Sequence, residues 1–173
     1  QKTRRMRNVV CGQRVTNLVG ALVRSDPRPA LGRSVLCLGC RHAHELGVCH
    51  AAGFGPVVGI DLVSAEASIM AMDFPQMTFP AAMFDVLFSC HSLEHAYDLD
   101  VALAEWARVT VPGGVWAIEV PTRFAVCDTD RHDLGSLDGL LARLAPYTGS
   151  VLWASAAERA TNGTAQAIVQ VRA

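Results

Sequence analysis

Residues 84–121 read FDVLFSCHSLEHAYDLDVALAEWARVTVPGGVWAIEVP and form the most informative segment of the chain. Residues 84–89 are a short apolar run with one acid, which is typical of a buried parallel strand. Asp98 is an expected N-cap, and it precedes four apolar residues at helical spacing: Leu99, Ala102, Leu103 and Trp106. We expect Pro112-Gly113-Gly114 to stop this helix and residues 115–120 to form the next strand. Since parallel strands need a long crossover, the segment predicts a parallel sheet.

The flanking residues extend this alternation of strands and helices. Thr16–Arg24 predicts a short helix that ends at Pro27 and Pro29. The next expected elements are a strand at 34–38, a helix at about 43–52, a strand at 57–60 and a short strand at 69–72.

The C-terminal third predicts one more helix and two more strands. Ser136 is an expected cap for a helix whose inward residues are Leu137, Leu140, Leu141 and Leu144. Residues 151–154 and 165–171 read as strands, and Asn162-Gly163 between them indicates an antiparallel pair. The sequence therefore predicts a doubly wound α/β fold with a mostly parallel seven-stranded sheet and a C-terminal antiparallel hairpin.

The segment 84–121 also resembles the second half of class I methyltransferases that use S-adenosylmethionine. The likeness lies in the strand, the Leu93-Glu94-His95 turn, the helix and the Pro-Gly-Gly turn into a strand. It is nearest to the small-molecule group that includes quinone-biosynthesis methyltransferases, and weaker similarity covers most of residues 31–173. The resemblance implies a Rossmann-like sheet, S-adenosylmethionine as cofactor and S-adenosylhomocysteine as product.

Composition fits one domain over residues 1–173, with residues 1–30 as a basic, helical N-terminal segment. Hydrophobic residues make up 51% of the chain, and the mean hydropathy is +0.26. No apolar run approaches the ~20 residues that span a bilayer, so we expect no membrane segment. The sequence shows no secretory signal, although a start at Gln1 rather than Met leaves the natural N-terminus open.

The net charge of −1 is unevenly distributed. The basic residues Lys2, Arg4, Arg5, Arg7 and Arg14 all lie before the first acid. Such an arm can contact phosphates, but no aromatic residues interleave with it, so we expect a solvated segment and no nucleic-acid partner. We read the six cysteines as reduced thiols of a cytoplasmic protein: Cys11, Cys37, Cys40, Cys49, Cys90 and Cys127.

In a sheet of this type, ligands bind beyond the carboxyl ends of the strands. Gly39 lets the backbone approach a ligand closely, and Arg41 can pair with a carboxylate of the cofactor. Asp61 lies 22 residues after Gly39, where a carboxylate can accept from both ribose hydroxyls. The resemblance implies that Asp73 accepts from the adenine amine. The full set of expected cofactor residues is Gly39, Cys40, Arg41, Asp61, Leu62, Asp73, Phe74, Ser89 and Cys90.

His91 follows the strand expected at residues 84–89. It is our candidate general base, because an imidazole can take up a proton near neutral pH. Glu94 and His95 are expected mainly to fix the loop. Thr122, Arg123 and Phe124 follow the next strand, where an acceptor could bind, and His132 is a second candidate base. The predicted acceptor-binding residues are His95, Thr122, Arg123 and His132.

The predicted function is transfer of a methyl group from S-adenosylmethionine to a small-molecule acceptor. The main alternative is an inactive scaffold or regulatory domain, because three positions of the family's glycine-rich motif are occupied by Cys37, Arg41 and Ala43. A nicotinamide dehydrogenase is a weaker alternative, since Gly39 and Asp61 also have its spacing. A zinc site is a further one, built from Cys37, Cys40, His42, His44, Cys49 and His50, but we expect no metal. The sequence does not identify the methyl acceptor, and it leaves open whether the protein forms a homodimer.

Overall fold

The computed structural model describes residues 2–64, 66–157 and 159–173, with side chains from Gly12 onward. Its elements run α1 (Lys2–Ser25), β1 (Val35–Leu38), α2 (His44–Ala51), β2 (Val57–Asp61), β3 (Ile69–Ala71), β4 (Phe84–Cys90), η1 (Leu93–His95), α3 (Leu99–Val109), β5 (Thr110–Thr122), α4 (Leu137–Leu144), β6 (Thr148–Ala157) and β7 (Gly163–Val171). The side chains of the basic N-terminal arm, Lys2 to Arg7, lie outside the described set.

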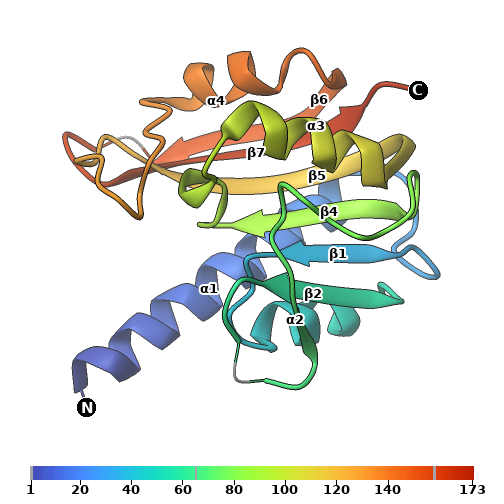
Figure 1. The fold of residues 1–173 in the computed structure, drawn as a ribbon, viewed down its shortest axis with the longest axis horizontal. Coiled ribbons are helices and arrows are strands. Elements are labelled where there is room, and N and C mark those ends of the chain that lie inside the picture. Colours follow the sequence, from blue (N-terminus) through green and yellow to red (C-terminus); the bar gives the residue numbers. More distant parts are fainter. Residues whose placement is uncertain (1, 65, 158) are drawn as a thin grey trace.

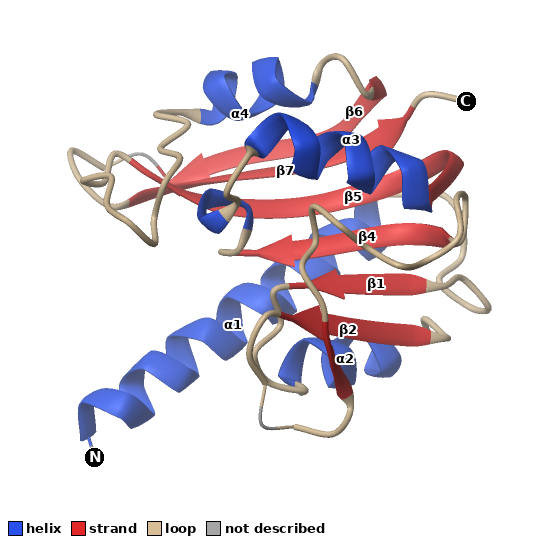
Figure 2. Cartoon of the chain, in the orientation of Figure 1, coloured by secondary structure: helices blue, strands red, loops and turns tan. Residues whose placement is uncertain are grey.

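The seven strands form one sheet in the order β3-β2-β1-β4-β5-β7-β6 (Figures 1 and 2). The pairs β1–β2, β2–β3, β1–β4 and β4–β5 are parallel. Strand β7 pairs antiparallel with both β5 and β6. The predicted doubly wound sheet with a C-terminal hairpin is therefore confirmed.

Helices cover both faces of the sheet. Helices α1 and α2 pack with Val35, Phe88 and Ala117 on one face. Helices α3 and α4 pack on the other face, where Trp106 and Trp116 meet edge to face at 5.8 Å. Figure 1 shows this division, with α3 and α4 in front and α1 and α2 behind. Because both faces are covered, the central strands are apolar almost throughout.

Helix α1 is much longer than the predicted segment Thr16–Arg24. It spans 24 residues and ends at Ser25, just before Asp26-Pro27. Among the residues of this helix whose side chains the structure describes, Gly12 to Ser25, the buried hydrophobic ones are Val15, Leu18, Val19, Ala21 and Leu22. The predicted segment contains four of these five residues, which is why the apolar pattern marks it.

The sequence predicts that Pro112-Gly113-Gly114 stops α3, and this prediction is wrong. The helix ends at Val109, and the next residue is already extended. Residues 111–114 lie opposite Asp85 alone, so they form an irregularity inside β5 rather than a turn before it. Gly113 has φ +72°, and a Cβ on Gly114 would crowd Thr110 and the Val111 carbonyl. The glycines therefore permit this close backbone crossing.

Other boundaries differ by one to three residues. Both predicted caps are confirmed, since Asp98 accepts from Asp100 N and Val101 N, and Ser136 Oγ accepts from Gly139 N. Within the described part of the chain, no helix is long and apolar enough to cross a membrane.

Candidate active site

The predicted ligand loops meet at one edge of the sheet. In the parallel register Leu38 lies beside both Ile60 and Ser89, and Ser89 lies beside Ile118. The carboxyl ends of β1, β2, β4 and β5 are thus neighbours. The loop after β1 is fastened to β2, because the amides of Gly39 and Cys40 donate to the Ile60 carbonyl at 2.9 and 3.2 Å.

Gly39 is required by its contact with the loop after β4. Its φ is +68°, and a Cβ would overlap the side chain of Ser92. Ser92 is buried, and its hydroxyl donates to the Leu38 carbonyl at 2.8 Å and lies 2.7 Å from Ser89 Oγ. Ser89 and Ser92 therefore tie the ends of β1 and β4 together beneath the ligand edge.

Cys40 does not present its side chain to a ligand. The thiol is buried, with Sγ 3.6 Å from the Ile60 carbonyl, and burial raises the pKa of Cys40 to about 12. The residue as a whole is 1% exposed, so Cys40 supports the loop from inside. Cys37 and Cys49 are also buried in the core, whereas His42 pairs with Glu66 and His44 Nε2 lies 3.4 Å from the Gly12 carbonyl. Among the residues that the structure describes, no cluster that could hold a metal exists.

The N-terminal end of α2 is already contacted by a carboxylate of the chain. Glu66 Oε2 accepts from the Ala43 amide at 2.7 Å, and Oε1 lies 3.3 Å from His42 Nδ1. Arg41 between these loops is exposed, and its carbonyl accepts from Ser64 Oγ at 3.3 Å. The loop is thus held by Glu66 and Ser64, while the Arg41 guanidinium stays accessible.

The end of β2 combines a carboxylate with exposed apolar side chains. Asp61 Oδ1 accepts from the Val63 amide at 2.8 Å. Leu62 is 66% exposed and Val63 is 71% exposed. Exposed aliphatic side chains beside an accessible acceptor suit a ligand that has one flat face and two hydroxyls.

Asp73 and Phe74 after β3 face different environments. Asp73 is exposed, and its carbonyl accepts from the Gln76 amide at 3.1 Å. Phe74 is buried, and its ring lies edge to face with Trp106 at 5.9 Å. The carboxylate is therefore accessible, whereas the ring belongs to the core that supports the loop.

His91 is held by a carboxylate that the sequence analysis did not single out. His91 has φ +55°, and its amide donates to the Glu119 carbonyl at 2.9 Å. Its Nε2 lies 2.9 Å from Glu119 Oε1, while Gln166 Nε2 donates to the other carboxylate oxygen. Arg14 from α1 adds an ion pair to Glu119 at 3.7 Å. Side chains from α1, from β7 and from the loop after β4 therefore converge on one carboxylate of β5.

The charge state of Glu119 fixes the proton on His91. The Glu119 side chain is only 1% exposed, and burial opposes its ionisation. Hydrogen bonds from His91 and Gln166, together with Arg14, outweigh that effect and lower its pKa. An ionised carboxylate can only accept, so Nε2 of His91 carries the proton and Nδ1 has the lone pair when the ring is neutral.

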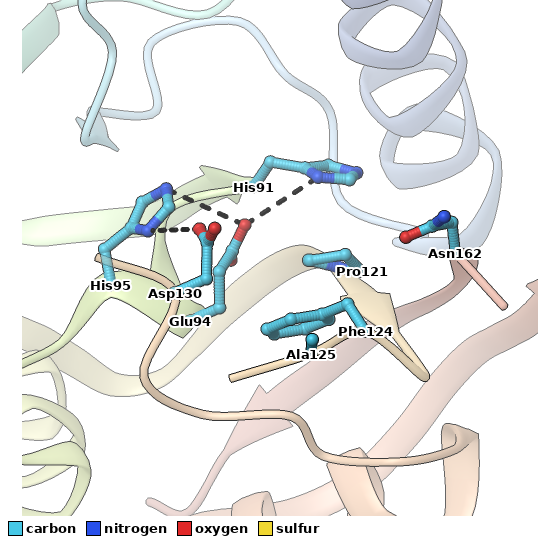
Figure 3. A pocket seen from close by; sticks show the side chains of 8 residues that line it. All are labelled: His91, Glu94, His95, Pro121, Phe124, Ala125, Asp130 and Asn162. Carbon is cyan, nitrogen blue, oxygen red and sulfur yellow. Dashed lines mark ion pairs between the residues drawn. The ribbon is translucent and has the colours of Figure 1, made fainter. Parts of the chain in front are cut away.

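A cavity of about 480 Å³ opens beside His91 (Figure 3). Its wall is formed by His91, Glu94, His95, Pro121, Phe124, Ala125, Asp130 and Asn162. These residues come from the ends of β4 and β5, the following loop and the turn before β7. The Glu94 carbonyl accepts from the amides of Arg131 and His132, which holds that loop over η1.

Glu94 is the least satisfied polar group of the cavity. Its side chain is 3% exposed, and its Oε2 has no hydrogen-bond partner within the described part of the chain. Oε1 lies 3.7 Å from His91 Nδ1 and 3.9 Å from His95 Nε2, beyond hydrogen-bond length. Burial, the largest influence, raises the pKa of Glu94, although both histidines oppose this.

Of the four predicted acceptor-binding residues, only His95 lines the cavity. Its Nδ1 lies 3.1 Å from Asp130 Oδ1 and 2.9 Å from the Thr129 carbonyl. Thr122 is buried, Arg123 donates from Nη1 to the Arg159 carbonyl, and His132 Nε2 lies 2.9 Å from the Ala96 carbonyl. These three side chains are directed to the surrounding protein.

The sequence contained one usable signal for Glu119. It is an acid within the apolar run Val115 to Val120, and a carboxylate in a buried strand almost always has a partner. Asn162 carried no comparable signal, because its place at the cavity depends on the β5–β7 pairing that sets Thr122 opposite Gly163.

Comparison with known proteins also points to a methyltransferase domain. Residues 36–118 match the family model described as a methyltransferase domain. No curated protein matches the sequence.

Several solved structures share the fold. The Burkholderia thailandensis 1,6-didemethyltoxoflavin-N1-methyltransferase superposes with a TM-score of 0.74 at 15% identity, covering 94% of this chain and 79% of that one. An S-adenosylmethionine-dependent methyltransferase from Mesorhizobium loti superposes with a TM-score of 0.62 at 12% identity, covering 87% of this chain and 96% of that one. The [4+2]-cyclase SpnF superposes with a TM-score of 0.72 at 16% identity, covering 91% of this chain and 80% of that one. Since a cyclase is among them, this likeness shows the fold and not the reaction.

A methyltransferase-domain model matches residues 36–118, and the solved structures share the fold over most of the chain, so the chain has a methyltransferase-like fold.

Proposed function

We propose that this protein binds S-adenosylmethionine across the ends of β1, β2 and β3 and methylates a small molecule seated in the cavity beyond β4 and β5. One observation carries the proposal: the accessible Asp61 and the cavity at His91 lie at the same edge of one sheet. A ligand edge that offers a nucleoside acceptor at one end and a polar cavity at the other fits a reaction between a cofactor and a second substrate.

The residues at this edge fit the cofactor. Asp61 would accept from the ribose hydroxyls, Leu62 would cover one face of the adenine, and Asp73 would accept from its amine. The Gly39 backbone and the Arg41 guanidinium would face the methionine portion, together with Cys90 at the end of β4, while Cys40 and Ser89 would support these loops from beneath. Phe74 would act only from behind, as part of the core. When bound, the cofactor supplies a methyl group already activated by a sulfonium.

His91 is the proposed general base. With Nε2–H held by Glu119, its Nδ1 can take a proton from an acceptor hydroxyl or ammonium in the cavity. Glu119 then stabilises the imidazolium, in the role that a buried carboxylate plays beside other catalytic histidines. His95 would contact the acceptor, while Thr122, Arg123 and His132 would shape the cavity loop. Positioning of this kind supplies roughly 7–11 kcal/mol of a barrier.

The inactive-scaffold alternative is favoured by a specific contact. Glu66 occupies the Ala43 amide at the start of α2, and the family's glycine positions hold Arg41 and Ala43. If the Glu66 contact excludes the cofactor, the protein keeps the fold but does not bind S-adenosylmethionine.

Calorimetric titration with S-adenosylhomocysteine separates the two. The wild type should show saturable binding, and Asp61→Asn should weaken it about fivefold or more, because the substitution removes the negative charge and turns one of the two acceptor oxygens into an NH₂ donor. Asp138→Asn removes an exposed charge on α4 and serves as the matched control, with unchanged affinity. No saturable heat from folded wild-type protein would support the scaffold instead.

A further inference from the structure

We propose that the cavity takes an amine: a small acceptor with a protonated or N–H-bearing nitrogen, which binds the Glu94 carboxylate, whose Oε2 has no hydrogen-bond partner among the described residues. This inference rests on the proposed function and adds the chemical class of the second substrate. Figure 3 shows the Glu94 carboxylate among the polar groups of the cavity, between His91 and His95.

The first argument is the hydrogen-bonding state of Glu94. A carboxylate has room for several donors, and a buried one without them is strongly disfavoured. Glu94 is nine-tenths buried or more, and no described residue donates to its Oε2. A ligand N–H at this position would satisfy an oxygen that the protein leaves unpaired.

The second argument is the charge of the wall. The described lining residues include the carboxylates Glu94 and Asp130 and two histidines, but no lysine or arginine. The nearest arginines in sequence are used elsewhere: Arg131 stacks over Tyr97 at 4.8 Å, and Arg123 donates to the Arg159 carbonyl. An acceptor with a carboxylate or phosphate would therefore meet carboxylates without a fixed cation.

The histidines do not neutralise Glu94, because each has a closer carboxylate. His91 lies 2.9 Å from Glu119, and His95 lies 3.1 Å from Asp130. Arg14 is a further cation beside Glu119, at 3.7 Å. With both rings neutral, Arg14 therefore faces the three carboxylates Glu94, Glu119 and Asp130, and these groups together carry excess negative charge. A cationic ligand would reduce that excess.

The remaining wall limits the size and shape of the acceptor. Pro121, Phe124 and Ala125 give the cavity an apolar side opposite the carboxylate, and its volume is about 480 Å³. An amine with a compact apolar or aromatic body matches both sides. The same geometry serves the chemistry: the ammonium N–H bond breaks, its electron pair stays on nitrogen, and the proton passes to Nδ1 of His91.

Three probes of nearly equal size test the inference: 2-phenylethylamine, 2-phenylethanol and 3-phenylpropionate. Each is titrated into full-chain protein saturated with S-adenosylhomocysteine and followed by ligand-observed NMR. The amine should bind about tenfold or more tightly than the acid, with the alcohol between them. Glu94→Gln should lower amine affinity to the level of the alcohol, while Asp138→Asn should leave it unchanged.

The outcomes separate this inference from the function on which it rests. Equal or tighter binding of the acid, an amine preference that survives Glu94→Gln, or no saturable binding of any probe while S-adenosylhomocysteine binds would each overturn the amine assignment alone. Failure of S-adenosylhomocysteine itself to bind would overturn the proposed function as well. If Glu94→Gln does not fold, the comparison of the three probes on the wild type still decides.

Discussion

Glu94 and Glu119 are both buried beside His91, yet their pKa values shift in opposite directions. Glu119 receives hydrogen bonds from His91 and Gln166, which favour its charged form despite burial. Glu94 receives none on Oε2, so burial dominates and favours its neutral form. Two carboxyl groups with pKa values moved apart by their surroundings are a frequent feature of sites that bind or transfer protons.

The opposite shifts predict opposite effects of two matched substitutions. Because the folded-state pKa of Glu94 is raised, its ionisation destabilises the folded protein as pH rises above the ordinary glutamate range. Glu94→Gln should therefore raise the free energy of unfolding by about 1–2 kcal/mol at pH ~7, with the gain lost near pH ~4. Urea unfolding at the two pH values measures it.

Glu119→Gln is the matched comparison. The folded-state pKa of Glu119 is lowered, so its stabilising contribution is present above the ordinary glutamate pKa and is lost as pH falls through the lowered value. The variant should be destabilised at neutral pH and should approach the wild type in acid. Effects of equal sign for the two variants would contradict the assigned charge states.

Sequence reasoning found part of this site at the residue scale. His91, Asp61 and Asp73 were found because each directly follows a recognisable strand, and strand ends meet at one edge. Glu119 was missed because its role depends on contacts with His91, in the loop after β4, and Gln166, in β7, and both are far away in the chain. Cys40 and Phe74 are at the expected loops, but their side chains turn inward, and strand position does not determine that direction.

Among the helices and strands, local sequence signals were sufficient to predict the helix caps. They were insufficient to predict those ends of helices and strands that depend on packing. Asp98 and Ser136 cap helices through contacts within four residues, so their roles could be predicted. Residues 2–14 carry little apolar periodicity, and the first half of α1 was therefore missed. The Pro-Gly-Gly segment has the composition of a turn, but β5 pairs with β4 on both sides of it, at Thr110 and from Val115 onward, so the segment lies inside the strand.

The loop between β1 and α2 gives a test that compares two glycines. Gly39→Ala should lower the free energy of unfolding by about 1–3 kcal/mol, because it strains a residue with positive φ and pushes a methyl group into Ser92. Gly47→Ala lies in α2 with open space around its Cβ, so it should raise stability by up to about 1 kcal/mol. Thermal unfolding of both variants provides the check, and a harmless Gly39→Ala would refute the close Ser92 contact.

At the scale of the whole molecule, ion pairs at the opposite edge hold the layers together. Asp26, just after α1, is buried and pairs with Arg28 at 2.9 Å and Arg33 at 2.8 Å. Arg28 also donates to the Gly113 carbonyl at 2.8 Å. These contacts join the end of α1, the entrance to β1 and the irregular part of β5. Although burial opposes ionisation, the two arginines lower the pKa of Asp26.

Asp26→Asn should therefore destabilise the fold without altering the ligand edge. We expect a loss of about 2 kcal/mol at neutral pH, because the arginines lose a charged acceptor. The loss should shrink in acid, since the wild-type contribution disappears as pH falls through the lowered pKa. Arg143→Gln breaks an exposed pair with Asp100 and should change stability by less than about 1 kcal/mol. A similar effect for both variants would remove Asp26 from this structural role.

The fold class could be predicted because strand and helix patterns alternate along the chain, and parallel strands leave few topologies. The cavity could not be predicted in the same way. Its wall combines residues 91–95, 121–125, 130 and 162, which only the β4–β5 and β5–β7 pairings bring together.

A crystal structure with S-adenosylhomocysteine tests most directly whether cofactor and acceptor share one edge of the sheet. We expect the ribose hydroxyls on the Asp61 carboxylate, the adenine against Leu62 and the sulfur directed toward the cavity of His91 and Glu94. Ligand bound at any other place, or no ligand in crystals grown at saturating concentration, would contradict this expectation.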